Sequence, residues 1–240
     1  MSPVVTPDIV KNLAPSGTLK ATINLGNMVL AQGTPDAPSG ITVDISRELA
    51  RRLSVPVEFY CFDQAGKAFE GFRKQNLDIA FLAIEPVRAA EIEFTAPYVL
   101  IEGVYMVPNG SPLNKVEEVD AKGMRIAVAK DAAYDLFLTR SLKNATLVRG
   151  PESFERLSRG EVDVAAGVKQ PVVAYAKAHP EVRVLDGRFM EIRQAMGTQK
   201  GRDIGAHYLK AFIEDLKTSG FIAAGLKRSN QPEATVAPPA

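Results

Sequence analysis

A short segment of the chain, Glu85-Pro-Val-Arg88, carries charged side chains at a spacing that could bind a small ionic solute. The planar guanidinium of Arg88 can hold a carboxylate through two parallel, charge-assisted hydrogen bonds, which orient the bound group as well as attract it. Glu85 could accept hydrogen bonds from a cationic group of the same solute, or it could neutralise Arg88. The alternative for Arg88 is a surface arginine paired with Glu85 or Glu91.

Two further loops carry polar groups that suit a binding site. Asn24 and Asn27 lie on either side of Gly26 and offer amide donors and acceptors to a ligand, although asparagine is also common in turns that bind nothing. Lys130 and Asp131 come just before a predicted helix. Lys130 either adds positive charge to a cleft or extends into solvent, whereas Asp131 is expected to cap the helix through its short side chain.

One short pattern is repeated in the sequence. The segments LDIAFLAIEP (77–86) and VDVAAGVKQP (162–171) both follow an amphipathic helical pattern, both open an apolar strand with Asp, and both have Pro eight residues after that Asp. The repeat predicts two similar α/β lobes, and the loops at the carboxyl ends of their strands would enclose a ligand cleft. The alternative is chance similarity, since an apolar strand between Asp and Pro is common in α/β domains.

Hydrophobic periodicity alternates between strands and helices along the chain, which is typical of an α/β fold. A first strand is predicted at residues 19–23. Apolar residues recur every fourth position in two predicted helices, as Ile45, Leu49 and Leu53 in one and as Tyr208, Phe212 and Leu216 in the last. Apolar runs at 99–107 and 189–197 are the expected places where the chain crosses from one lobe to the other and back, and together they predict a two-stranded hinge.

The composition favours a small solute as the partner. The chain has 240 residues, of which 46% are hydrophobic and 24% charged, and its formal net charge is +1. A globular chain of this length can bury a sizeable core. The balanced charge argues against nucleic acid or an anionic membrane surface as the main partner. No stretch is long and apolar enough for membrane insertion.

The N-terminal residues lack the basic start and apolar core of a secretory signal. As written, the sequence therefore predicts a cytoplasmic protein, and a periplasmic one if a leader has been removed.

The segment EPVRAAEIEFTAPY (85–98) resembles a signature of the family 3 extracellular solute-binding proteins, the receptors of polar amino acid ABC transporters. The resemblance extends through GTLKATI, GITVDISRELARRL, LDIAFLAI, MRIAVAK, GEVDVAA and RQAMGTQKG, and so covers nearly the whole chain. It implies two Rossmann-like lobes joined by two hinge strands, the periplasmic binding protein type II-like architecture, with a ligand between the lobes, no catalysis and an ABC permease as partner. A monomer is expected.

The domain boundaries expected from this resemblance give a discontinuous first lobe. It contains residues 1–106 and 194–229, the second lobe contains residues 107–193, and residues 230–240 form an irregular tail.

The resemblance also implies roles for individual residues. The family's arginine that pairs with a ligand carboxylate corresponds to Arg88, and the Thr or Ser that often precedes it is replaced by a run containing Ala83. In the second lobe, the backbone amides of Ala132 and Ala133 would meet the carboxylate at a helix N-terminus. An acidic residue that often binds the ligand's ammonium group is missing, and Lys169 lies in that region. The ligand is therefore expected to be a carboxylate or other polar solute, with Lys130 and Lys169 nearby.

Two other function classes stay open. The family's fold resembles that of cyclohexadienyl dehydratases, in which Glu85 would be the candidate acid or base. Against an enzyme, His179 and His207 have no nucleophile or metal-ligand companion at a recognisable spacing, and no phosphate-binding loop of the G-x-x-x-x-G-K type is present. No cofactor or metal is expected. The third class is a cytosolic orphan binding or sensor module that never meets a transporter.

Overall fold

The computed structural model describes residues 3–231 and 234–240, and the chain divides into two compact units. Unit 1 comprises Met1–Leu100 and Arg193–Ala240, and unit 2 comprises Ile101–Ile192.

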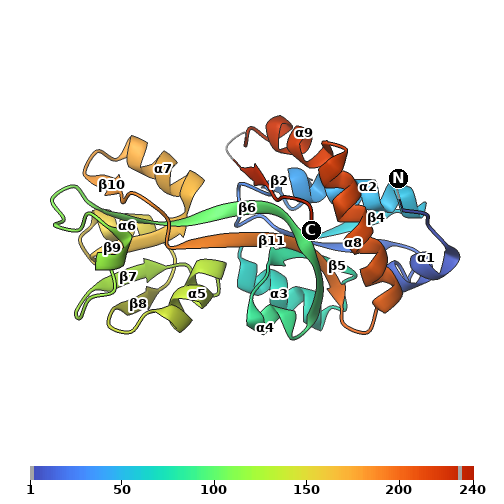
Figure 1. Ribbon diagram of the computed structural model, residues 1–240, viewed down its shortest axis with the longest axis horizontal. Coiled ribbons are helices and arrows are strands. Elements are labelled where there is room, and N and C mark those ends of the chain that lie inside the picture. The colour runs from blue at the N-terminus through green and yellow to red at the C-terminus, as the bar shows by residue number, and fades with distance from the viewer. Residues whose placement is uncertain (1–2, 232–233) are drawn as a thin grey trace. The chain divides into compact units, whose positions relative to one another are not determined.

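Two long strands, labelled in Figure 1, contain residues of both units. They are β6 (Ile92–Pro108) and β11 (Met190–Gln199). The chain passes from unit 1 to unit 2 within β6 and returns within β11, inside the two predicted crossing segments. The first segment of unit 1 ends at Leu100, whereas the expected boundary was residue 106.

The sheet of unit 1 places β1 between two parallel neighbours. β1 (Leu19–Asn24) pairs with β4 (Val57–Phe62) on one side and with β5 (Ile79–Ala83) on the other, and β11 then pairs antiparallel with β5. All five residues of β5 are buried. A strand that is apolar at every position, without alternation, is typical of a sheet covered on both faces.

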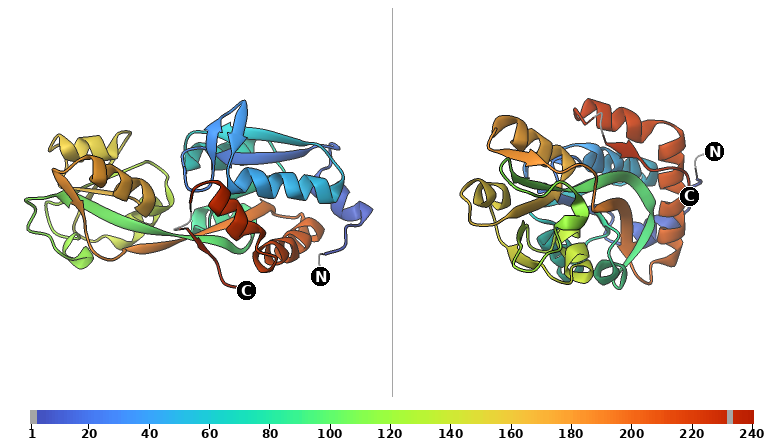
Figure 2. Two further views of the ribbon diagram at one scale, coloured as in Figure 1. Left: turned by 90° about the horizontal axis from the view of Figure 1, so that it is seen from above. Right: turned by 60° about the vertical axis from the view of Figure 1, so that its left-hand side comes forward.

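Helices join and cover these strands. The longer connections are α2 (Ile41–Leu53) and α3 (Ala65–Lys74). The remaining elements of unit 1 are α1 (Pro7–Leu13), β2 (Gln32–Thr34), β3 (Ala37–Ser39), α4 (Pro86–Ala89), α8 (Asp203–Thr218), α9 (Phe221–Arg228) and β12 (Thr235–Val236). Both views in Figure 2 show α1 beside α8, where the side-chain oxygen of Asn12 accepts a hydrogen bond from the Gly205 amide at 2.8 Å. None of the helices in the described residues has the length and apolar character needed to cross a membrane.

The helical faces predicted from periodicity are buried. Ile45, Leu49 and Leu53 lie inward on α2, and Tyr208, Phe212 and Leu216 lie inward on α8. Each of the buried Ile, Leu and Phe side chains contributes about 1.5–3 kcal/mol to folding through the apolar surface that it removes from water. The fourfold spacing in the sequence is thus confirmed as the signal of core-facing positions.

An ion pair also joins α2 to α8, as part of a network within α2. Glu48 accepts hydrogen bonds from the Nε atoms of Arg51 and Arg52, both at 2.8 Å. Arg52 in turn reaches Asp215 at 2.7 Å and lies 4.9 Å from the centre of the Phe212 ring. The hydrogen bond from Arg51, together with that from Arg52, lowers the pKa of Glu48 to about 2.

This pKa gives the protein an acid-sensitive contact. A carboxyl whose pKa is depressed by folding stabilises the native state above its unfolded pKa, and the stabilisation is lost as the pH falls through the folded value. As the pH falls from about 4.5 to about 2, the wild-type protein is therefore expected to lose the part of its folding stability that comes from ionised Glu48. The variant Glu48→Gln lacks this part at every pH. Urea unfolding across this range checks it, because the difference between the two proteins should shrink as the pH falls. A difference that stays constant with pH would contradict the assignment.

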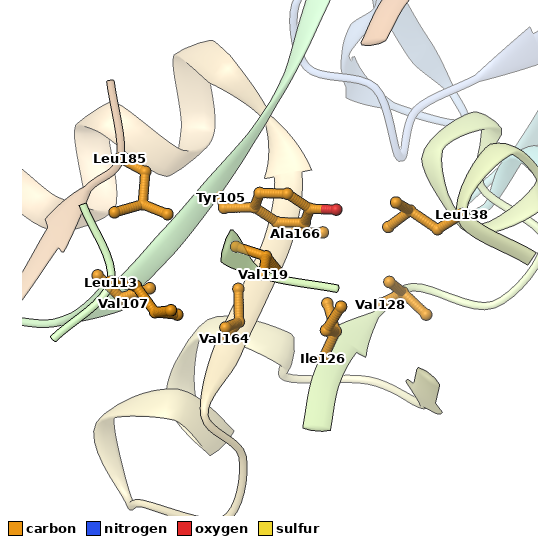
Figure 3. Close-up of a cluster of buried hydrophobic side chains, with 10 residues drawn as sticks. All are labelled: Tyr105, Val107, Leu113, Val119, Ile126, Val128, Leu138, Val164, Ala166 and Leu185. Carbon is orange, nitrogen blue, oxygen red and sulfur yellow. The ribbon is translucent and has the colours of Figure 1, made fainter. Parts of the chain in front are cut away.

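Unit 2 repeats the topology of unit 1 around a different strand. β7 (Arg125–Val128) lies between its parallel partners β8 (Thr146–Arg149) and β9 (Val164–Val168), and β6 pairs antiparallel with β9. The other elements of unit 2 are the 3-10 helix Val116–Glu118, α5 (Ala133–Ser141), α6 (Ser153–Ser158), α7 (Lys169–Ala178) and β10 (Val182–Val184), which pairs with β6. Figure 3 shows one of its apolar clusters, in which Tyr105 of β6 lies among side chains from β7 and β9.

The two repeated aspartates occupy equivalent places in the two units. Asp78 accepts the amide of Lys20 at the start of β1 and donates its own amide to the Lys20 carbonyl, at 2.8 and 2.9 Å. Asp163 makes the same reciprocal pair with Arg125 at the start of β7, at 2.9 and 3.0 Å. The two α/β lobes predicted from the repeat are therefore confirmed, and each Asp aligns the start of the central strand of its lobe.

The C-terminal tail departs from its prediction. Residues 230–240 were expected to be irregular, but β12 pairs with β6 at Leu100 and Val99, and the Ala237 amide donates to the Tyr98 carbonyl at 3.1 Å. The pairing gives hydrogen-bond partners to backbone groups on β6. The proline-rich composition of the tail does not by itself predict this pairing. Residues 232 and 233 lie outside the described part of the tail.

Candidate functional site

In unit 1, Arg88 is fully enclosed in protein. It lies on the short helix α4, which begins at Pro86 and is separated from the end of β5 by two residues, and only 2% of Arg88 is exposed. Its Nη1 donates to the Ala83 carbonyl at the end of β5, at 3.3 Å. Glu91 instead faces Arg73, with 3.9 Å between their charged atoms. The surface position in that alternative is therefore wrong, and a buried guanidinium lies at the carboxyl end of β5.

Glu85 is the second buried charge of this turn. It is 3% exposed and immediately precedes α4, and its carbonyl accepts the Arg88 amide at 2.9 Å. Burying charged groups is costly unless they are paired and hydrogen-bonded. The burial of two ionic side chains in one five-residue turn therefore favours a role for their charges in binding. Both residues remain predicted ligand contacts, together with Ala83.

Asn24 and Asn27 shape the loop that follows β1. The side-chain oxygen of Asn24 accepts the Gly26 amide at 3.1 Å, and that of Asn27 accepts the Val29 amide at 3.3 Å. Gly26 is required here, because a Cβ atom would lie 2.2 Å from the carbonyl oxygen of Asp63. The asparagines thus form the turn with their oxygens, and a contact with a ligand would fall to their Nδ2 groups.

In unit 2, the loop after β7 differs from its prediction in two respects. Asp131 has a φ of +59° and does not cap α5, whose N-cap is Ala132. The Ala132 amide is already used, since it donates to the Ala129 carbonyl at 3.2 Å. A preceding turn thus consumes the donor that was expected to meet a carboxylate. Lys130 is exposed, and Ala133 at the start of α5 is buried.

A buried carboxylate that the sequence analysis missed holds this loop. Asp135, 1% exposed, accepts the Asp131 amide at 2.8 Å and the Nε of Arg149 at 2.9 Å. Arg149, the last residue of β8, also donates to the Thr139 hydroxyl at 2.7 Å. The position of an acid in the first turn of a helix was a visible signal, but its partner on β8 was not.

Lys169 is paired rather than left as an unbalanced positive charge. It is the first residue of α7, directly after β9, and its Nζ lies 2.5 Å from a carboxylate oxygen of Glu102 on β6. The hydrogen bond from Lys169 lowers the pKa of Glu102. Lys169 therefore stays a predicted ligand contact together with Lys130, but its charge is balanced by Glu102.

Two hollows lie away from all the predicted site residues. One in unit 2, of about 600 Å³, is lined mainly by the loops preceding β7 and β9, and one in unit 1, of about 570 Å³, lies between residues 3–9 and α8. Across residues 3–231 and 234–240, no cluster of three or more His, Cys, Asp or Glu side chains is arranged to hold a metal ion.

In each unit, the predicted ligand-binding residues lie at or just after the carboxyl ends of β-strands. In unit 1, Asn24 ends β1 and Ala83 ends β5, with Glu85 and Arg88 following. In unit 2, Lys130 to Ala133 follow β7, and Lys169 follows β9. Carboxyl ends of parallel strands are where open α/β sheets bind ligands.

Solved structures share this fold. The solute receptor for L-cysteine of Neisseria gonorrhoeae matches with a TM-score of 0.78 and 22% identity, over 93% of this chain and 94% of that one. An ancestral amino acid-binding protein, a precursor of cyclohexadienyl dehydratase, gives 0.74 and 20%, over 91% and 98%. A histidine kinase sensor domain similar to periplasmic binding proteins gives 0.77 and 16%, over 92% and 98%. No curated protein sequence matches the chain.

A family model matches most of the sequence. Residues 28–228 fit the bacterial extracellular solute-binding proteins, family 3. This match includes the repeat, the Arg88 turn and both long strands. The two α/β units of the chain and its type II periplasmic binding protein fold agree with the structural matches. The chain therefore belongs to the family 3 bacterial extracellular solute-binding proteins.

Proposed function

We propose that this protein captures a small polar solute with at least one carboxylate, an amino acid or a related organic acid, and delivers it to an ABC-type permease. The observation that carries the proposal is the buried guanidinium of Arg88 at the carboxyl end of β5. A guanidinium fixed in this way is organised before the ligand arrives, so less entropy is lost when a carboxylate binds in a bidentate manner. The amino acid-binding proteins among the structural matches support the same ligand class.

We propose that the protein binds its solute without transforming it. Among the predicted site residues, Glu85 is the candidate acid or base, and it lies in the same turn as Arg88. General acid-base catalysis needs a group positioned against the reacting atoms with a pKa suited to proton transfer. The role assigned to Glu85 is instead to balance charge beside Arg88 and the ligand.

A sensor role is the second candidate, and one observation favours it. A histidine kinase sensor domain shares the fold over 92% of this chain. Ligand capture would be common to both roles, and the partner would differ. A permease and an ATPase encoded beside the gene would favour uptake, whereas a solitary gene would favour sensing.

A thermal-shift screen tests the proposed ligand class. A solute that binds the folded state raises the melting temperature according to its concentration and affinity. The panel consists of amino acids, keto acids, dicarboxylates, amines and prephenate-like compounds. We expect saturable shifts confined to carboxylates, by several degrees at a ligand concentration about 100 times Kd. Shifts produced by amines without a carboxylate, or a hit that the protein consumes during incubation, would contradict the proposal.

A further inference from the structure

Strand register places Glu102 directly beside Lys169. β6 and β9 are antiparallel, with Gly103 opposite Val168 and Val104 opposite Gly167. Glu102 and Lys169 are the residues next to the last pair, Lys169 as the first residue of α7, and their side chains meet at 2.5 Å. The end of the β6–β9 pairing therefore brings the two residues close together, and their opposite charges form the ion pair.

The surrounding backbone limits how far Glu102 can move. The Phe189 amide donates to the Gly103 carbonyl at 3.0 Å, and the Phe189 ring stacks on Tyr105 with 4.3 Å between centroids. Gly103 permits this approach, because a Cβ there would lie 2.7 Å from Met190. The same segment brings Arg188 to Glu102 at 3.3 Å.

The four charges of this cluster cancel. Glu102 pairs with Lys169 and Arg188, and Arg188 also contacts Glu191 at 3.3 Å. Lys169 starts α7 at the carboxyl end of β9, the edge of the sheet at which we place the ligand. Without Glu102, the lysine and the helix N-terminus would both present positive charge to a solute at that edge.

We infer that Glu102 determines which ligand charge the protein prefers, by acting as a permanent counter-ion for Lys169. The inference rests on the proposed function and adds a specificity residue to it. With Lys169 neutralised, the site favours solutes whose only negative group is one carboxylate. Glu102 thereby disfavours a second carboxylate that Lys169 alone would attract.

The test compares three probes that share an amino acid backbone and differ in side-chain charge: L-glutamine, L-glutamate and L-arginine. Calorimetric titration gives the affinity of each for the wild-type protein and for Glu102→Gln. We expect the substitution to raise the affinity for L-glutamate relative to L-glutamine by roughly tenfold, and to weaken L-arginine binding. The change should diminish at high salt, because both side chains are partly exposed.

Two further variants separate this effect from a general change in charge. Glu191→Gln removes an acid of the same cluster that contacts Arg188, and it should leave the glutamate-to-glutamine ratio near the wild-type value. The double variant Glu102→Gln/Lys169→Gln should restore that ratio. An unchanged ratio in Glu102→Gln, or an equal shift in Glu191→Gln, would overturn the inference alone. A wild-type protein that binds no probe and no solute of the screening panel would overturn the proposed function and the inference together.

Discussion

Replacing Asp78 by Asn is expected to lower the free energy of unfolding by about 3 kcal/mol, because it breaks a buried ion pair while leaving the cation in place. Asp78 is 2% exposed, and its Oδ1 lies 2.7 Å from Nη1 of Arg202. Its Oδ2 also accepts the Lys20 amide that aligns β1. An asparagine side chain keeps one acceptor oxygen, but its NH2 group then faces either the Lys20 amide or the Arg202 guanidinium, and both of these are donors. The positive charge of Arg202 also loses its negative partner. Urea unfolding measures the loss.

Asp163→Asn is the matched control in the repeated unit. Asp163 makes the same backbone pair with Arg125 and the same kind of ion pair, at 3.0 Å, but 40% of its side chain is exposed. Exposed pairs contribute about 0–1 kcal/mol, so the control should lose at most about 1 kcal/mol. Equal losses in the two variants would show that burial of the ion pair is not what makes Asp78 important.

The second large effect is expected on binding. Arg88→Lys should weaken the affinity for the carboxylate solute by about 2 kcal/mol or more, a scale typical of losing a charged hydrogen bond in a buried site. Lysine keeps the charge but presents an ammonium group in place of the planar fork that matches a carboxylate. Arg88 also donates to the Ala83 carbonyl within the fold. Calorimetry is therefore accompanied by circular dichroism and a melting curve, which confirm that the variant is folded.

Arg73→Lys serves as the control for that experiment. Arg73 lies on α3 in the same unit, and 52% of its side chain is exposed. The same chemical change at Arg73 should leave the affinity unaltered. A folded Arg88→Lys protein that binds the solute as tightly as wild type would remove Arg88 from the ligand site.

Much of the fold could be predicted because burial follows simple periodicities. The fourfold spacing of Ile45, Leu49 and Leu53 identified the inner face of α2. The repeated Asp was informative for a physical reason, since in both units it binds the start of the central strand. Local pattern was enough wherever the contacts of a residue followed from the element that carries it.

Contacts set by register and by turn geometry could not be predicted in the same way. Glu102 meets Lys169 only because β6 and β9 pair in one register, which no local pattern in either strand specifies. The Ala132 amide was expected to be a donor for ligands, but the left-handed residue before it creates a turn that uses this amide. The strand pairing of the tail is likewise a tertiary contact, made by a segment whose composition favours irregular structure.

The most direct test of the central claim is a calorimetric titration of the wild-type protein with the carboxylate that gives the largest thermal shift. We expect a saturable heat that fits one site, with the solute recovered unchanged after the titration. The same titration with the corresponding amide, in which the carboxylate that Arg88 would bind is neutral, should give at least tenfold weaker binding. Equal affinity for the acid and the amide would contradict capture through a buried arginine, and consumption of the solute would contradict binding without catalysis.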